Sequence, residues 1–319
     1  MIEDLTRAEY EALLRQDFAT FATRCFHDLN PQTELAMNWH LERIAAKLTA
    51  VREGKIRRLI INLPPRYLKS LMASIAFPAW CLGHDSSAQF LSVCYGQDLA
   101  DKLARDCRSI MVSPWYRQIF PTRLAAHRQA VQEFITTRQG YRLATSTGGV
   151  LTGRGADIIL IDDPLKPEEA LSAAQRQTTN EWYDHTLYSR LNDKRSGAIV
   201  IIMQRLHEDD LVGHVLAQEP WEVLRFPAIA EADEVHEIET IQAYRRADNF
   251  RSQLSARLPC AATSRRTDDR NCRWNPRDAV DTARSLLMPT VRKNPIDQPS
   301  PRPNLPQFDR QKVRSGVCP

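Results

Sequence analysis

The fold is decided by the stretch Arg58-Leu59-Ile60-Ile61-Asn62-Leu63-Pro64-Pro65-Arg66-Tyr67-Leu68-Lys69-Ser70. Its apolar part has the length of a buried β-strand, and the proline pair that follows ends it. After Lys69-Ser70, an apolar run over residues 71–82 is compatible with a helix. Strand, tight turn, Lys-Ser and helix is the layout of a phosphate-binding loop, in which backbone N–H groups at a helix N-terminus face the phosphates.

The polar groups of this loop suit phosphate chemistry. Lys69 would supply a point charge to the β/γ oxygens, and the Ser70 hydroxyl would ligate Mg²⁺. The usual pattern, G-x-x-x-x-G-K-[ST], has glycines where this chain has Leu63 and Leu68. Taken alone, the loop could therefore also be a strand, a proline turn and a surface lysine.

A second informative stretch begins at Gly148 and ends in Ile158-Ile159-Leu160-Ile161-Asp162-Asp163-Pro164. The four apolar residues predict a buried parallel strand, and two carboxylates follow it. Open α/β sheets bind ligands at the carboxyl ends of their strands. The pattern has the form of a Walker B motif, in which Asp162 would hold Mg²⁺ and Asp163 would orient and activate the attacking water. Capping of the following helix is the alternative, and it is compatible with that role.

Three further residues are candidates for the same site. Arg154 lies in a glycine-rich loop and is either an arginine finger for the γ-phosphate, a solvated surface residue or a DNA contact. Gln204 follows a predicted strand over residues 198–203, where P-loop motors sense the γ-phosphate. Trp39 precedes the loop, in a segment that either contacts adenine or anchors a helix to the core.

The remaining patterns alternate between helix and strand, which predicts an α/β fold. Helices are expected over residues 8–26, 39–51, 97–111 and 167–191, strands over 88–95, 158–161, 198–203 and 221–226, and a hairpin over 134–145 that turns at Gln139-Gly140. His207 and the three acids after it do not have the spacing of a known metal site, so an acid-rich helix N-terminus is the better interpretation.

Bulk composition restricts the class of protein. The 319 residues suffice for one large α/β domain or two smaller ones. No apolar run reaches about 18 residues, so no membrane span is expected. The start, Met1-Ile2-Glu3-Asp4, is unlike a signal peptide. The seven cysteines are scattered without a C-x-x-C pair, which favours a reducing cytoplasm over disulfides or zinc.

Three motifs together resemble the large subunit of tailed-phage terminases. They are the Leu-Pro-Pro-Arg-x-x-Lys-Ser loop, the Leu-Thr-Gly-Arg-Gly-Ala-Asp lead into Ile-Asp-Asp-Pro, and Met-Gln-Arg-Leu-His-Glu-Asp-Asp-Leu, in the family's order from about Trp39 to Ala232. The resemblance implies a RecA-like ASCE P-loop ATPase with ATP and Mg²⁺ as cofactors, which drives viral DNA into a procapsid. It also implies double-stranded phage DNA, a terminase small subunit and a portal protein as partners. A homo-oligomeric ring in the bacterial host cytoplasm would be the active form.

The resemblance assigns roles to individual residues. Asp162 would hold the metal with Ser70, and Asp163 would be the catalytic carboxylate, although many members have Glu there. Gln204 falls in the coupling motif, where Thr or Ser is more usual. The missing glycines are tolerated in relatives with Pro-Pro-Arg-x-x-Lys-Ser loops. The residues expected to bind the nucleotide are Trp39, Arg66, Tyr67, Leu68, Lys69 and Ser70.

The end of the chain departs from the family, whose large subunits continue into an RNase H-like nuclease domain. Residues 1–240 hold 27 Lys+Arg and 32 Asp+Glu, net −5, whereas residues 241–319 hold 16 and 7, net +9. The second segment has no glutamate, 14 arginines and nine prolines, and its apolar periodicity disappears. A basic DNA-binding arm is one interpretation. We favour a wrong reading frame in a degenerate prophage gene, in which case another frame beyond codon 240 encodes an acidic, periodic domain.

We therefore expect three segments. Residues 1–57 form a helical segment packed on an ATPase domain at 58–235, and residues 241–319 form a disordered or frameshifted tail that replaces the nuclease. Nuclease activity is not expected. Two alternatives remain: another DNA-dependent translocase, which would need a second lobe that the tail cannot supply, and a remnant that binds nucleotide without catalysis.

Overall fold

The structure is a computed structural model that describes residues 6–35, 37–149, 151, 153–227, 235–236 and 272–273. The chain divides into two compact units, Met1–Pro276 and Arg277–Pro319, and all described residues belong to the first. Of the predicted tail, residues 241–319, the structure describes β10 (Cys272–Arg273), which pairs antiparallel with β9 (Val235–His236). The proposed division into three segments therefore stays a prediction.

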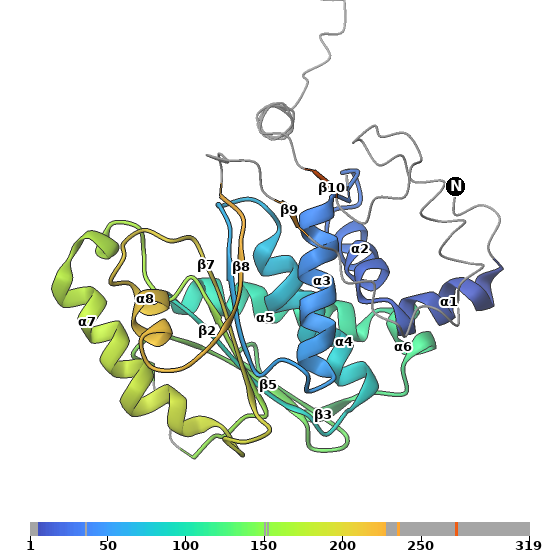
Figure 1. The fold of residues 1–319 in the computed structure, drawn as a ribbon. Coiled ribbons are helices and arrows are strands. Elements are labelled where there is room, and N and C mark those ends of the chain that lie inside the picture. The colour runs from blue at the N-terminus through green and yellow to red at the C-terminus, as the bar shows by residue number, and fades with distance from the viewer. Residues whose placement is uncertain are drawn as a thin grey trace, which may run out of the picture. The chain divides into compact units, whose positions relative to one another are not determined.

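An eight-stranded sheet forms the centre of this unit (Figure 1). Six strands run parallel, in the spatial order β5, β2, β6, β7, β1 and β8. Strands β4 and β3 extend the sheet beyond β5 and are antiparallel. This confirms the predicted α/β fold with a mostly parallel sheet flanked by helices. In spatial order the strands are β3 (Leu124–Gln129), β4 (Glu133–Thr136), β5 (Tyr141–Ser146), β2 (Gln89–Cys94), β6 (Ile158–Asp162), β7 (Ala198–Met203), β1 (Arg58–Asn62) and β8 (Glu222–Arg225).

Helices cover both faces of the sheet, so its central strands are apolar on both sides. Alternate residues of β1 show this, because Leu59 and Ile61 join one core and Ile60 joins the other. The first core includes residues of the N-terminal helices. These helices bury their aromatic residues on the same face of the sheet as the helix that follows the Lys69 loop. The helices on that face are α1 (Arg7–Gln16), α2 (Phe18–Leu29), α3 (Trp39–Arg52), α4 (Phe77–His84), α5 (Gln97–Val112) and α6 (Pro114–Ile119). The other face carries α7 (Ala173–Trp182) and α8 (Leu211–Leu216) (Figure 1).

Two predicted helices are interrupted. The helix expected over 8–26 is two helices, because Asp17 adopts an extended backbone and its side chain accepts a hydrogen bond from Thr20 N–H, which caps α2. The long helix expected over 167–191 breaks into a 3₁₀ turn (Glu169–Leu171), α7, a π-helix (Tyr183–Leu187) and a second 3₁₀ turn (Tyr188–Arg190). Ser172 caps α7 through its hydroxyl. Strand β3 and helix α6 were not predicted, and Ser113, the residue that ends α5, also caps α6.

The helix after the loop is also irregular. It starts at Lys69 and Ser70, runs as a π-helix over Leu71–Ala76 and continues as α4. Pro78 lies two residues beyond the π-helix, and proline has no N–H to donate to the carbonyl of residue 74. We attribute the local widening of the helix to this proline, because a proline ring also crowds the carbonyl four residues before it.

The described part of the chain also bears on two bulk expectations. No helix in it is long and apolar enough to cross a membrane. Among the cysteines whose side chains the structure describes, Cys25, Cys81, Cys94 and Cys107 are buried and form no disulfide with one another.

Candidate nucleotide-binding site

The candidate site lies at the carboxyl ends of three neighbouring strands. The loop with Lys69 follows β1, the two carboxylates end β6, and Gln204 follows β7, which lies between them. The register pairs Asn62 with Met203 and Asp162 with Ile202, so the three strands end at the same edge. Neighbouring strands are about 4.8 Å apart, which brings the end of β1 within about 10 Å of the end of β6. An extended lysine side chain can cross that gap.

Lys69 and Asp163 form an ion pair across this edge. The Lys69 Nζ lies 2.6 Å from the Asp163 carboxylate, and the lysine side chain is 7% exposed against 23% for the aspartate. Asp163 is held by its backbone, because its N–H donates to the Ile202 carbonyl and its carbonyl accepts from Tyr95 N–H. The Gln204 N–H adds a donor at 3.3 Å from Asp163 Oδ1. Three predicted site residues are therefore brought into contact.

Asp162 faces the helix that follows the loop. Its Oδ2 accepts a 2.7 Å hydrogen bond from the Ser74 hydroxyl, and its Oδ1 has no hydrogen-bond partner in the described part of the chain. Burial raises the pKa of Asp162 to about 6, and the charge of Asp163 acts in the same direction, while hydrogen bonds from Ser74 and Ser70 oppose the rise. A buried carboxylate oxygen without a partner beside a serine hydroxyl fits Mg²⁺, which prefers oxygen ligands.

The loop contains left-handed backbone at two residues that are not glycine. Arg66 has φ of 69° and Leu68 has φ of 59°. Leu68 stands where the usual pattern has its second glycine, and the left-handed region costs a side-chain-bearing residue about 1–2 kcal/mol. Leu63, at the position of the first glycine, has no positive φ and is buried in the core. Leu68, at the second glycine position, is therefore strained, whereas Leu63, at the first, is not.

Arg66→Gly is expected to stabilise the protein, because Arg66 is exposed and its side chain makes no hydrogen bond or ion pair within the described residues. Relief of the left-handed strain, less the entropy that glycine loses on folding, should raise the free energy of unfolding by roughly 0.5–1 kcal/mol. Urea denaturation measures this. Arg66→Ala is the matched control, since alanine keeps the strain, and an equal gain in both variants would rule out backbone relief as the cause.

Aromatic rings connect α3 to the loop. Trp39 is the first residue of α3, and its ring centroid lies 5.5 Å from that of Phe226. The neighbouring His40 ring lies 5.7 Å from Tyr67 and 6.3 Å from Phe226. The packing of Trp39 is that of a residue that anchors its helix to the core. A contact of Trp39 with adenine, and of Tyr67 with the nucleotide, stays a prediction.

Acidification is expected to destabilise the protein through His40. Burial lowers the pKa of His40 to about 4, whereas the unfolded value is about 6.5. Between these two values the unfolded chain binds a proton that the folded chain does not, so stability is lost as pH falls through this window. The cost should be roughly 1–3 kcal/mol by pH 4. Urea midpoints at pH 7 and pH 5 should differ less in His40→Gln than in the parent. The exposed His185→Gln is the control, and the same change in both variants would contradict the assignment.

Arg154 lies away from the candidate site of its own chain. Its guanidinium pairs with Glu133 of β4 at 2.7 Å and stacks over the Tyr141 ring at 5.5 Å. β5 and β2 lie between β4, which carries Glu133, and β6, which ends in Asp162, so these two strands are about 14 Å apart across the sheet. In this geometry, Arg154 does not act as an arginine finger for the site of its own chain.

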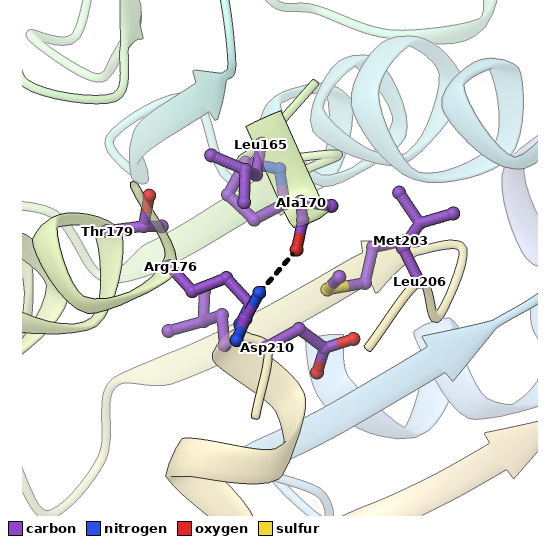
Figure 2. A pocket seen from close by; sticks show the side chains of 9 residues that line it. Leu165, Ala170, Arg176, Thr179, Met203, Leu206 and Asp210 are labelled. Atoms are coloured by element: carbon purple, nitrogen blue, oxygen red, sulfur yellow. Dashed lines mark hydrogen bonds between the residues drawn. The ribbon is translucent and has the colours of Figure 1, made fainter. Parts of the chain in front are cut away.

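Two buried residues near the site were not predicted from the sequence, because no local pattern marks them. Ser74 is one hydroxyl in an apolar run, and its contact with Asp162 depends on how the helix lies over the sheet. Arg176 lies in a small cavity between the loops that follow β6 and β7, where its Nη1 donates to the Ala170 carbonyl at 2.8 Å (Figure 2). Met203 and Asp210 line the same cavity. Residues of the loop that follows Asp163 and of the loop that follows Gln204 therefore lie around one cavity.

Comparison with known proteins gives similarity to phage large terminases. The large terminase of bacteriophage HK97 is 12% identical with a TM-score of 0.40, and the comparison covers 84% of this chain and 52% of that one. The large terminase of a thermophilic bacteriophage, solved in complex with ADP, is 13% identical with a TM-score of 0.35, over 57% of this chain and 44% of that one. This chain thus matches about half the length of each terminase. No protein-family model matches the sequence, and no curated protein matches it.

Proposed function

We propose that this chain is a Mg²⁺-dependent ATPase that acts as the motor part of a phage terminase large subunit. The observation that carries the proposal is the meeting of Lys69 and Ser70, from the loop after β1, with Asp162 and Asp163 at the end of β6. A loop lysine, a hydroxyl and two carboxylates at one sheet edge are the parts that phosphoryl transfer from ATP needs. The loop beside these residues is exposed and has strained backbone, and such strain is commoner at functional sites than in loops with only a structural role.

Each residue has a part in the chemistry. On nucleotide binding, Lys69 would leave Asp163 and bind the β- and γ-phosphate oxygens. Asp163 would then accept a hydrogen bond, and finally the proton, from the water that attacks the γ-phosphorus. Ser70 and Asp162 would hold Mg²⁺, which neutralises charge on the phosphates when bound. Arg66, which is exposed in the loop, would contact the nucleotide.

The larger role extends to partners. In a packaging motor, the chain would act on double-stranded DNA with a small subunit and a portal protein, as a ring of several copies. Gln204 would link the state of the nucleotide to motion, because its N–H contacts Asp163 and it leads into the loop beside Arg176. Arg154 would serve a neighbouring copy rather than its own chain.

The test is Mg-ATP binding and hydrolysis by the purified full chain, with and without double-stranded DNA. We expect binding, and turnover that DNA increases. Binding without turnover under any condition would favour the nucleotide-binding remnant instead. If a folded protein binds no nucleotide, the loop with Leu68 is not a phosphate site and the proposal fails.

A further inference from the structure

The helix after the loop has a carbonyl group that its own backbone cannot satisfy in the usual way. In an α-helix, the N–H of residue 78 would donate to the carbonyl of residue 74, and Pro78 has no N–H. Ser74 is 1% exposed, so its carbonyl needs a partner from within the protein. A side chain from the sheet donates a hydrogen bond to this carbonyl.

Arg142 supplies the donor. Its Nη2 lies 3.2 Å from the Ser74 carbonyl oxygen, and the residue is fully buried as the second residue of β5. Arg142 pairs with Phe90 of β2, and Cys94 of the same strand pairs with Asp162. Phe90 and Cys94 belong to the same core, so the side chains of Arg142 and Asp162 lie on one face of the sheet.

The rest of the guanidinium is poorly satisfied. Within the described residues, its Nε and Nη1 have no hydrogen-bond partner, and no carboxylate forms an ion pair with it. Burial lowers the pKa of Arg142, and the negative charge of Asp162 is among the influences that oppose this. A buried charge with so few partners is costly, and an apolar residue of similar size would often give a more stable fold. Stability alone therefore does not explain an arginine here.

Ser74 connects this arginine to the metal-binding carboxylate. Its carbonyl accepts from Arg142, and its hydroxyl donates to Asp162 at 2.7 Å. We propose that Arg142 is a positioning residue that holds Ser74, and through it the carboxylate of Asp162, in the orientation that binds Mg²⁺. This inference rests on the proposed function, because it assigns a support to that same site. Residues that orient metal ligands typically change metal affinity by about 10- to 100-fold when they are removed.

The first experiment measures how much Mg²⁺ strengthens ATP binding to the full chain. Dissociation constants for ATP are determined by calorimetry with Mg²⁺ and with EDTA. In Arg142→Met and Ser74→Ala we expect the Mg²⁺-dependent gain to fall about tenfold, with the Mg²⁺-free affinity unchanged. Ser74→Thr, which keeps the hydroxyl, should restore most of the gain. Ser92→Ala is the matched control, because Ser92 is also a buried serine on this side of the site and its hydroxyl has no partner among the described residues.

The second experiment needs no nucleotide. A double-mutant cycle between Arg142→Met and Asp162→Asn, read from urea unfolding, should give a non-additive change of about fivefold or more in the unfolding equilibrium constant. The same cycle with Ser74→Ala in the background should show that this coupling disappears. Additive effects, or a folded Arg142→Met protein whose Mg²⁺ gain equals that of the parent, would overturn the proposal. If the parent binds no ATP, the proposed function fails on its own, and the cycle still decides whether Arg142 positions Asp162.

Discussion

Asp163→Asn is expected to remove ATP turnover and leave Mg-ATP bound. The amide cannot accept the proton of the attacking water, and loss of a general base costs about 10²- to 10⁴-fold in rate. The substitution would keep the shape of the side chain and the backbone contacts with Ile202 and Tyr95. The ion pair with Lys69 would be lost, which frees the lysine for phosphate and should keep or increase the affinity for ATP.

Single-turnover hydrolysis and ATP titration on the same preparation separate the two effects. Glu168→Gln is the matched control, since it neutralises an exposed acid of the loop after β6 and should leave both quantities unchanged. Turnover by Asp163→Asn within about threefold of the parent, far short of the loss expected for a missing general base, would mean that another group activates the water.

Lys69→Ala is expected to remove nucleotide binding. Hydrogen bonds to charged groups contribute about 1.5–3 kcal/mol each, so ATP binding should weaken by roughly 10- to 150-fold for each hydrogen bond that the lysine makes to the phosphates. Stability should change little, because Asp163 is 23% exposed and solvent can take the place of the ammonium group. Both ATP affinity and the urea midpoint should be measured.

The control for Lys69→Ala is Lys166→Ala, which removes an exposed lysine of the loop after β6. It should bind ATP as the parent does. Equal ATP affinity in Lys69→Ala and the parent, with both proteins folded, would remove the loop from the nucleotide site.

The sequence predicted the strands that carry the candidate site well, because buried parallel strands are short apolar runs with polar residues at their ends. Residues 158–161 and 198–203 were expected as strands, and β6 and β7 occupy Ile158–Asp162 and Ala198–Met203. The rule that ligands bind at the carboxyl ends of such strands then predicted the side on which Lys69 and Asp163 meet. Their contact at 2.6 Å follows from strand order, which a local pattern does not contain.

What the sequence did not reveal are contacts between segments far apart in the chain. One example is the set Ser74, Arg142 and Asp162, which come from a helix and two different strands. No sequence motif links one of these residues to the others. The irregular helix after the loop had a local cause in Pro78, yet its consequence, a carbonyl satisfied from β5, depends on tertiary packing. The catalytic roles of Asp163, Gln204 and Arg154 stay predictions.

The ion pair between Arg154 and Glu133 has a consequence for how the rate would depend on protein concentration. If Arg154 completes the site of a neighbouring copy, an isolated chain lacks one charge at its site, and its rate per molecule should rise with concentration until neighbours associate. Dilution would then slow the reaction without weakening ATP binding, since Lys69 and Ser70 belong to the same chain as Asp163. Association would also exchange Glu133 for phosphate as the partner of Arg154, so high salt, which weakens exposed ion pairs, would act on both states.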